Sequence, residues 1–307
     1  METLTTSSSP YKGLSILRNV SEASVNREPF TYAVIEDALD RDLYATLVRE
    51  FPDDKLLADG PLPKGKKVGK NACDLLALDH LSGTWKQFIE YHTSKEFYLE
   101  ILSLFASDIR RLHPILTKDK NKTLESFGTA MRNKKNRRSA HASDDIVLDC
   151  QIMVDETTEL RRPRGPHVDA VNEIFACLLY IPHPDDPGNI GGDLCLMQAT
   201  DKSTIHSRKN TITVSKPPAE LSDECVDTVR VIPYKANTAI FFINSPNSIH
   251  GVTERQATPI PRRHVNVIGE TYSLRGNQGL FQIHRPAAEA QHNQTGFLNS
   301  IKNLLKF

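Results

Sequence analysis

The residues best suited to chemistry in this chain are two histidines and one aspartate that are widely separated in the sequence. His167 and Asp169 are two residues apart, so an extended backbone directs both side chains to the same face. His250 follows an apolar run and opens another extended segment. Two imidazoles and one carboxylate can occupy one face of an iron ion and leave the other positions open for a co-substrate and dioxygen. The pattern predicts a metal site formed by His167, Asp169 and His250.

The tripeptide His-x-Asp is a weak indicator by itself, because the chain contains it twice. His183-Pro184-Asp185 has the same spacing, but its prolines place it in a loop where no strand fixes the side chains. An isolated histidine such as His250 is also more often a buried structural residue than a ligand. The context favours the first copy, because Gly165-Pro166 provides a turn before His167 and an arginine pair follows His250.

The arginine pair Arg262-Arg263 offers a second recognition element. A guanidinium after the second histidine can hold the far carboxylate of an organic acid that is bound to the same metal. Neighbouring residues of a strand point in opposite directions, so only one of the two can face the metal. The sequence leaves open whether this residue is Arg262 or Arg263.

Composition excludes several classes of protein. The chain has 307 residues, enough for one large domain or two small ones, and its 38 basic and 38 acidic residues give a formal net charge of zero. A general nucleic-acid binder needs a basic surplus, and a membrane span needs an apolar run of roughly 18 residues, which the chain lacks. The N-terminus shows no signal-peptide pattern, and the five cysteines never form CxxC. We therefore expect a cytoplasmic monomer or homodimer with reduced thiols and without nucleic-acid or membrane partners.

The pattern of apolar and polar residues changes along the chain. Short strand-like segments separated by turn signals fill residues 146–272, and helical periodicity dominates before them. The predicted regions are a flexible N-terminus (1–28), a helical region with a polar loop that belongs to the same domain (29–145), a β-rich catalytic core (146–272) and a C-terminal extension with an amphipathic helix (273–307). Many short strands without intervening helices indicate a mainly β fold with flanking α-helices, of the sandwich or jelly-roll type.

Several local expectations follow from the same patterns. Residues 53–72 are rich in Gly, Lys and Pro and are typical of a loop, and residues 118–145 predict a polar loop that is either solvated or a lid over an anionic substrate. Residues 85–112 predict one long or two consecutive helices, broken before Pro114. Gly191-Gly192 lies between two apolar segments and predicts a tight hairpin.

Taken in order, the motifs resemble those of the Fe(II)- and 2-oxoglutarate-dependent dioxygenases, close in pattern to the prolyl-hydroxylase-like branch. The resemblance covers roughly residues 146–272 and rests on Gly-Pro-His167-Val-Asp169, the strand ending Leu178-Leu179-Tyr180, the Gly-Gly-Asp-Leu turn, Phe241-Phe242 before His250-Gly-Val, and Arg262-Arg263-His264-Val265-Asn266-Val267. It implies a double-stranded β-helix (jelly roll, cupin-like) core with N-terminal helices packed on it. It also implies Fe(II) held by His167, Asp169 and His250, with 2-oxoglutarate as co-substrate and O2 as oxidant.

The resemblance assigns further roles around the iron. The far carboxylate of 2-oxoglutarate would pair with Arg262, which matches the family pattern better, and Arg263 is the alternative. Leu179 takes the position where some relatives use a co-substrate-binding tyrosine. Leu194 and Val252 are expected as apolar walls of the co-substrate pocket.

The reaction implied by the resemblance is hydroxylation, desaturation or epoxidation of a small molecule, such as an amino acid, a sugar acid or a secondary metabolite, with release of succinate and CO2. Halogenating relatives replace the carboxylate ligand with a small residue, so Asp169 argues for hydroxylation. An anionic substrate would be bound by a basic or polar residue near the iron: Arg161, Arg162, Arg164, Asn266 or the basic cluster at 132–138. The alternatives are a protein side-chain (prolyl-type) hydroxylase and a non-catalytic, cupin-like metal-binding sensor.

Overall fold

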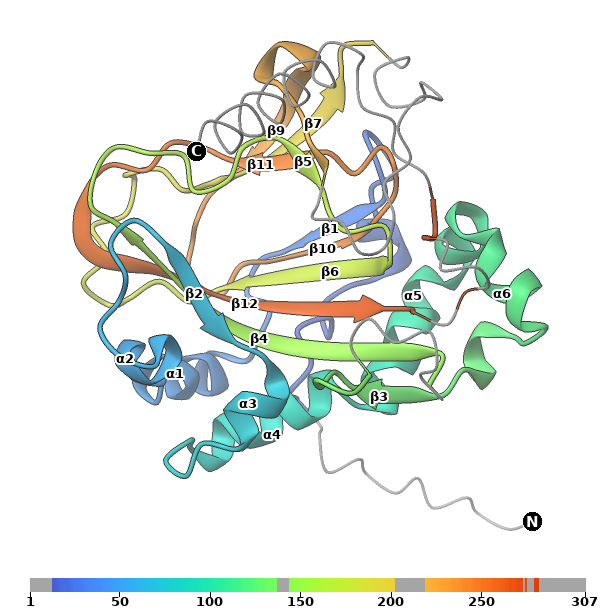
Figure 1. Cartoon of the computed structure of the whole chain (residues 1–307), viewed down its shortest axis with the longest axis horizontal. Coiled ribbons are helices and arrows are strands. Elements are labelled where there is room, and N and C mark those ends of the chain that lie inside the picture. Colours follow the sequence, from blue (N-terminus) through green and yellow to red (C-terminus); the bar gives the residue numbers. More distant parts are fainter. Residues whose placement is uncertain (1–12, 137–143, 202–218, 273, 275–278, 282–307) are drawn as a thin grey trace, which may run out of the picture.

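Two mostly antiparallel β-sheets face each other, and helices cover the outer face of the larger sheet (Figure 1). The computed structural model describes residues 13–136, 144–201, 219–272, 274 and 279–281. Within them the chain is mainly β with flanking helices, as the sequence predicts, and the arrangement is consistent with a jelly-roll-like fold. No described helix is both long and apolar enough to cross a bilayer.

The larger sheet provides one wall of the space between the sheets. In the described residues its strands run in the order β1-β10-β6-β12-β4-β2, and β3 pairs with β4 in parallel. Their bounds are Tyr32–Ile35 (β1), Ala239–Ile243 (β10), Glu173–Tyr180 (β6), Thr258–Glu270 (β12), Ile146–Thr157 (β4), Lys67–Lys70 (β2) and Thr129–Met131 (β3). Three described strands from the predicted N-terminal region, β1, β2 and β3, therefore join the same sheet as the strands of the predicted core.

The smaller sheet carries the predicted metal ligands. Its order is β8-β5-β11-β7-β9, with bounds Ala219–Glu220 (β8), His167–Val168 (β5), His250–Val252 (β11), Leu194–Ala199 (β7) and Val226–Ile232 (β9). β5 and β11 are neighbours, so residues 83 positions apart in the sequence become partners across one strand pair.

The described helices lie between residues 22 and 225, and the five α-helices before Pro114 begin at side-chain caps. Their bounds are Arg41–Arg49 (α1), Asp54–Ala58 (α2), Ala72–Leu76 (α3), Gly83–His92 (α4), Lys95–Leu112 (α5) and Pro114–Lys120 (α6), with short 3-10 turns at Glu22–Ser24, Leu124–Ser126 and Asp223–Cys225. The Asp40, Ser82 and Ser94 side chains accept backbone N–H groups at the starts of α1, α4 and α5. The expected break before Pro114 is confirmed, because α6 begins at that residue.

Strand β6 shows how side-chain alternation separates the core from the space between the sheets. Cys177 and Leu179 face the helices, in the main hydrophobic cluster with Phe105 and Phe241, whose rings stack at 4.3 Å. Ala176 and Leu178 face the opposite sheet. The helices thus bury one face of β6 and leave the other face available for a binding site.

Two local expectations are wrong. Residues 53–72 are not a plain loop: Asp53 caps α2, and residues 67–70 pair with β4 as strand β2. Gly191-Gly192 is not a hairpin turn, because β6 and β7 belong to different sheets. Some of the predicted regions lie outside the described residues: residues 202–218 of the β-rich core, the amphipathic helix of the C-terminal extension and the last part of the 132–138 cluster.

Buried histidines beneath the sheet should make stability depend on pH. Burial lowers the pKa of His92 from 6.5 to about 3, although its Nδ1 lies 2.7 Å from the carbonyl of Phe88. The unfolded chain takes up a proton near pH 6.5 and the folded protein does not, so stability is present above pH 6.5 and is lost as the pH falls below it.

We expect His92→Gln to remove this dependence. Between about pH 7.5 and 5.5 the wild type should lose roughly 1.4 kcal/mol more free energy of unfolding than the variant. Urea denaturation at the two pH values measures the difference, and a variant at the exposed His80 serves as the control. Equal losses in the wild type and His92→Gln would contradict the assignment.

Candidate metal centre

The two predicted histidine ligands lie side by side across strands β5 and β11. His167 and His250 are register partners, and their ring centroids are 4.2 Å apart. Asp169 follows β5 directly, and its carboxylate oxygens lie 3.5 Å from Nε2 of His167 and 3.6 Å from Nε2 of His250. All three ligand atoms lie within 4.8 Å of one another. The structure therefore brings His167, Asp169 and His250 together as one group, the His–Asp–His site.

Backbone carbonyls fix the tautomer of both histidines. Nδ1 of His167 lies 2.9 Å from the Gly165 carbonyl, and Nδ1 of His250 lies 2.9 Å from the Ser248 carbonyl. A carbonyl oxygen can only accept, so each Nδ1 carries the proton and each Nε2 keeps its lone pair toward Asp169. This is the form in which an imidazole binds a metal ion.

The electrostatics of the site favour the ligand forms of His250 and Asp169. Burial, together with repulsion from His167, lowers the pKa of His250 to about 4, so this ring is neutral at neutral pH. Burial alone would raise the pKa of Asp169, but the two histidines outweigh it and hold that pKa below its ordinary range. The site thus presents two imidazole nitrogens and one carboxylate, a donor set that suits a divalent iron ion.

The second His-x-Asp copy does not form a comparable group. The His183 and Asp185 side chains lie 3.7 Å apart, and the Asp185 side chain is 78% exposed. Among the described residues, the only cluster of three or more potential metal ligands is the His–Asp–His site. The His–Asp–His site therefore differs from the isolated pair in having a third potential ligand, His250 of β11.

The His–Asp–His site opens into a cavity of about 470 Å³ between the two sheets. This volume falls within the range of small-molecule sites. The walls come from both sheets, and the inward-facing residues of β12 line the cavity at every second position: Arg262, His264, Asn266, Ile268 and Glu270. We name the two ends of this row the Arg262 end and the Glu270 end.

Arg262 is a buried cation without a carboxylate partner. Only 4% of the residue is exposed, and no acidic side chain of the described chain lies within ion-pair distance. Its Nε donates to the Gly192 carbonyl at 3.0 Å, and its Nη1 lies 3.3 Å from Nδ1 of His264. A buried guanidinium usually pairs with an anion, so Arg262 is placed to bind an anionic ligand in the cavity.

Aromatic rings and a glycine pair hold Arg262 in place. Its guanidinium carbon lies 5.2 Å from the ring centroid of Tyr180 and 4.8 Å from that of Tyr234. A Cβ on Gly192 would come within 3.3 Å of the Arg262 side chain, and a Cβ on Gly191 would lie 1.8 Å from the Glu254 carbonyl. The glycine pair is therefore needed for close approach to the arginine and to the neighbouring chain, not for a hairpin.

Arg263 points away from the cavity, as expected for the neighbouring residue of a strand. Its Nη2 lies 2.9 Å from the Asp54 carboxylate, and its guanidinium carbon lies 4.4 Å from the ring centroid of Phe51. Arg263 is thus an ion-pair partner on the outer face of the sheet. Of the two alternatives, Arg262 alone lines the cavity.

The assignment of Leu179 to the co-substrate pocket is wrong by one position. Leu179 is fully buried on the helical side of β6, whereas Leu178 lines the cavity and Tyr180 lies beside Arg262. The Tyr180 hydroxyl is buried and has no hydrogen-bond partner at normal distance. Leu194 and Val252 do line the cavity, as predicted.

The three arginines before the metal strand have different surroundings. Arg161 pairs with Asp155 and Arg162 pairs with Asp223, and neither lines the cavity. Arg164 lines the cavity, with Nη1 3.2 Å from the Glu220 carboxylate. The structure therefore leaves Arg164, and not its neighbours, as a residue that can meet a substrate.

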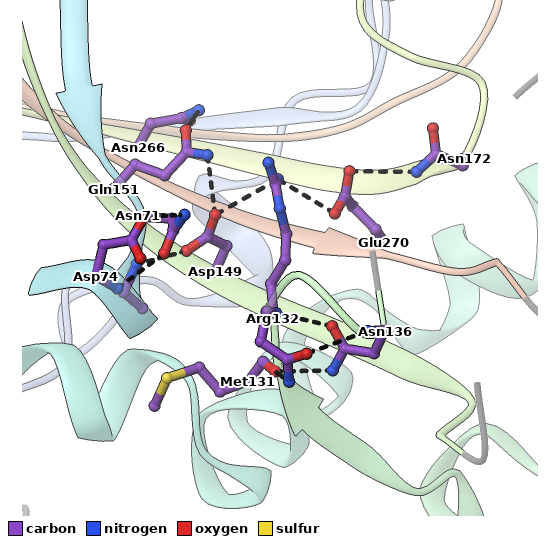
Figure 2. A network of polar contacts seen from close by, with 12 residues as sticks. Asn71, Asp74, Met131, Arg132, Asn136, Asp149, Gln151, Asn172, Asn266 and Glu270 are labelled. Carbon is purple, nitrogen blue, oxygen red and sulfur yellow. Dashed lines mark hydrogen bonds and ion pairs between the residues drawn. The ribbon is translucent and has the colours of Figure 1, made fainter. Parts of the chain in front are cut away.

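Sequence reasoning missed a polar network at the Glu270 end, shown in Figure 2. Arg132, expected in a solvated loop or lid, is 7% exposed and lies between the carboxylates of Asp149 and Glu270. Glu173 and Asn172 line the same part of the cavity. The sequence signal for this network is weak. Asp149 and Glu270 lie in the predicted β-rich core, but Arg132 lies before it in the sequence and comes near them because β3 pairs with β4.

Comparison with known proteins is limited to likeness of structure. No protein-family model and no curated protein matches the chain. The structure is similar to that of a prolyl 4-hydroxylase from Phytophthora capsici, at 12% identity over 96% of this chain and 76% of the other, with a TM-score of 0.44. It is similar to the epimerase SnoN in complex with Fe3+, alpha ketoglutarate and nogalamycin RO, at 15% identity over 83% and 81%, with a TM-score of 0.42. It is also similar to an oxidoreductase of the 2OG-Fe(II) oxygenase family from Burkholderia pseudomallei, at 14% identity over 81% and 88%, with a TM-score of 0.34.

Proposed function

We propose that this protein is an Fe(II)- and 2-oxoglutarate-dependent oxygenase that oxidises a small molecule. The observation that carries the proposal is the presence, in one cavity, of the His–Asp–His site and a buried arginine without a carboxylate partner. A dicarboxylate co-substrate needs both features, a metal for one end and a cation for the other. We also propose that the two facing sheets form a double-stranded β-helix.

Each residue has a role that its surroundings support. His167, Asp169 and His250 would hold the iron, and the carbonyls of Gly165 and Ser248 keep the two imidazoles in the ligand tautomer. When bound, iron and dioxygen would convert 2-oxoglutarate to succinate and CO2 and insert the second oxygen atom into a C–H bond of the substrate. The protein contributes position, burial and exclusion of water.

Arg262 would bind the far carboxylate of 2-oxoglutarate. The rings of Tyr180 and Tyr234 and the Gly192 carbonyl fix the guanidinium before any ligand arrives, so little side-chain entropy is lost on binding. Leu194 and Val252 supply apolar walls. A metal-binding sensor without turnover would have no use for this fixed, unpaired cation.

The activity can be tested by incubating the protein with Fe(II), 2-oxoglutarate and air, and measuring succinate. We expect slow succinate formation by the wild type even without the second substrate, and none above background by His167→Ala. His183→Ala, in the isolated His-x-Asp copy, is the matched control and should retain the wild-type rate. Absence of succinate in the wild type, with iron bound, would favour the sensor.

A further inference from the structure

The charge of the cavity reverses along strand β12. At the Arg262 end the lining basic residues are Lys67, Arg164 and Arg262. The carboxylates near them are Asp155, which pairs with Arg161, Glu220, which pairs with Arg164, and Asp169 of the His–Asp–His site. The other end lies eight residues further along the strand, about 26 Å away. The lining charges at that end are predominantly acidic, so the two ends suit ligand groups of opposite charge.

At the Glu270 end, two carboxylates share a single cation. Nη1 of Arg132 lies 3.2 Å from Oε2 of Glu270 and 3.4 Å from Oδ2 of Asp149, so one guanidinium bridges both (Figure 2). Glu270 also accepts hydrogen bonds from Tyr272 at 2.8 Å and Asn172 at 3.2 Å. These two carboxylates are therefore satisfied by the protein itself.

Glu173 is the lining carboxylate at this end that has no ion pair among the described residues, although Arg132 acts on it from a longer distance. It lines the cavity on β6, opposite Glu270 in the strand register, and no basic side chain of the described chain lies within ion-pair distance of it. Burial, with repulsion from Asp169 and Glu270, raises the pKa of Glu173 well above its ordinary range. Glu173 is half-buried, and a cation bound beside it would stabilise its ionised form and so lower that pKa.

A hydrogen-bond relay presents a second acceptor to the same cavity. The Asp149 carboxylate can only accept, so the Gln151 amide turns its Nε2 toward it at 2.9 Å and its Oε1 toward Nδ2 of Asn266 at 3.2 Å. These two hydrogen bonds orient the Asn266 amide. Its Oδ1 is buried and accepts no hydrogen bond from the described residues. Figure 2 shows the relay from Asp149 through Gln151 to Asn266.

We propose that the substrate carries a cationic nitrogen, an ammonium or guanidinium group, that binds Glu173 at the Glu270 end, while an N–H or O–H of the same molecule donates to Asn266. The inference deepens the proposed function, because it assigns the Arg262 end to the co-substrate and the Glu270 end to the substrate. It replaces the expected anionic substrate: an anion would meet Glu173 and Glu270, and the nearby Arg132 already bridges two carboxylates.

The test uses the full-length, metal-free protein, so that it does not depend on turnover. Calorimetric titrations compare n-butylammonium and n-butylguanidinium with the neutral n-butanol and the anionic butyrate. We expect the wild type to bind one or both cations in preference to the neutral and anionic probes. Glu173→Gln should weaken cation binding at least about tenfold, because it removes the charge and retains the shape.

Two further variants keep the result interpretable. Glu173→Asp retains the charge and should retain the preference for cations, whereas Glu36→Gln removes an exposed carboxylate outside the cavity and should change nothing. The proposal is overturned if the wild type binds no cation, if butyrate binds more tightly, or if Glu173→Gln binds cations as well as the wild type. Cation binding without succinate formation would instead refute the oxygenase activity and leave the cation site standing.

Discussion

Replacing Asp169 by alanine should abolish Fe(II) binding and reduce succinate formation to background. Asp169 is the one anionic ligand, and both imidazole Nε2 atoms face it at 3.5 and 3.6 Å. Without it, two neutral nitrogens would have to bind a divalent cation alone. Loss of an outer-shell partner already costs about 10- to 100-fold in metal affinity, so loss of this ligand should cost more than about 100-fold.

Anaerobic calorimetric titration with Fe(II) measures this effect directly. Asp185→Ala is the matched control, because it removes the carboxylate of the isolated His-x-Asp copy, whose side chain is largely exposed. The control should bind iron as the wild type does. Unchanged iron affinity in Asp169→Ala would show that the metal, if bound, is held elsewhere.

Replacing Arg262 by methionine should weaken 2-oxoglutarate binding by about two to three and a half orders of magnitude. Arg262 is buried and has no acidic partner among the described residues. The carboxylate of the proposed ligand would therefore be its anionic partner. Removal of one member of a buried ion pair costs about 3–5 kcal/mol, which corresponds to this loss of affinity. Iron affinity should change little, since Arg262 does not contact the His–Asp–His site by any hydrogen bond or ion pair in the described chain.

The neighbouring arginine provides a control of the same type and charge. Arg263→Met removes the ion pair with Asp54 on the outer face, so it should lower stability and leave 2-oxoglutarate affinity unchanged. Both affinities can be measured by anaerobic titration of the iron-loaded variants. Retained affinity in Arg262→Met, or a large loss in Arg263→Met, would reverse the assignment of the two residues.

The placing of His167 and Asp169 on one face could be predicted from the sequence, because their spacing reflects strand geometry. In an extended backbone the side chains of His167 and Asp169 point to the same face, whichever strands pair with it. The choice between Arg262 and Arg263 needed the register of β12, which depends on contacts with β4 and β6. The same dependence explains the error at Leu179, since a shift of one residue moves a side chain to the other face of a strand.

The Glu270 end of the cavity could not be predicted from local patterns. Arg132 belongs to a polar, basic segment that is typical of a solvated loop, yet it pairs with Glu270, 138 residues away. Glu173 begins an apolar strand and carries no motif. Pairing between strands that are far apart in the sequence brings these residues together. Hydrophobic periodicity predicts single strands but not which strands pair.

The most direct test of the central claim is anaerobic titration of the iron-loaded protein with 2-oxoglutarate, followed by visible absorption. If the His–Asp–His site and Arg262 bind iron and 2-oxoglutarate in one cavity, a charge-transfer band should appear and saturate at one equivalent. The band should be absent in His167→Ala, and in Arg262→Met it should require far higher 2-oxoglutarate concentrations. No band in the iron-loaded wild type, or an equal band in His167→Ala, would contradict the claim.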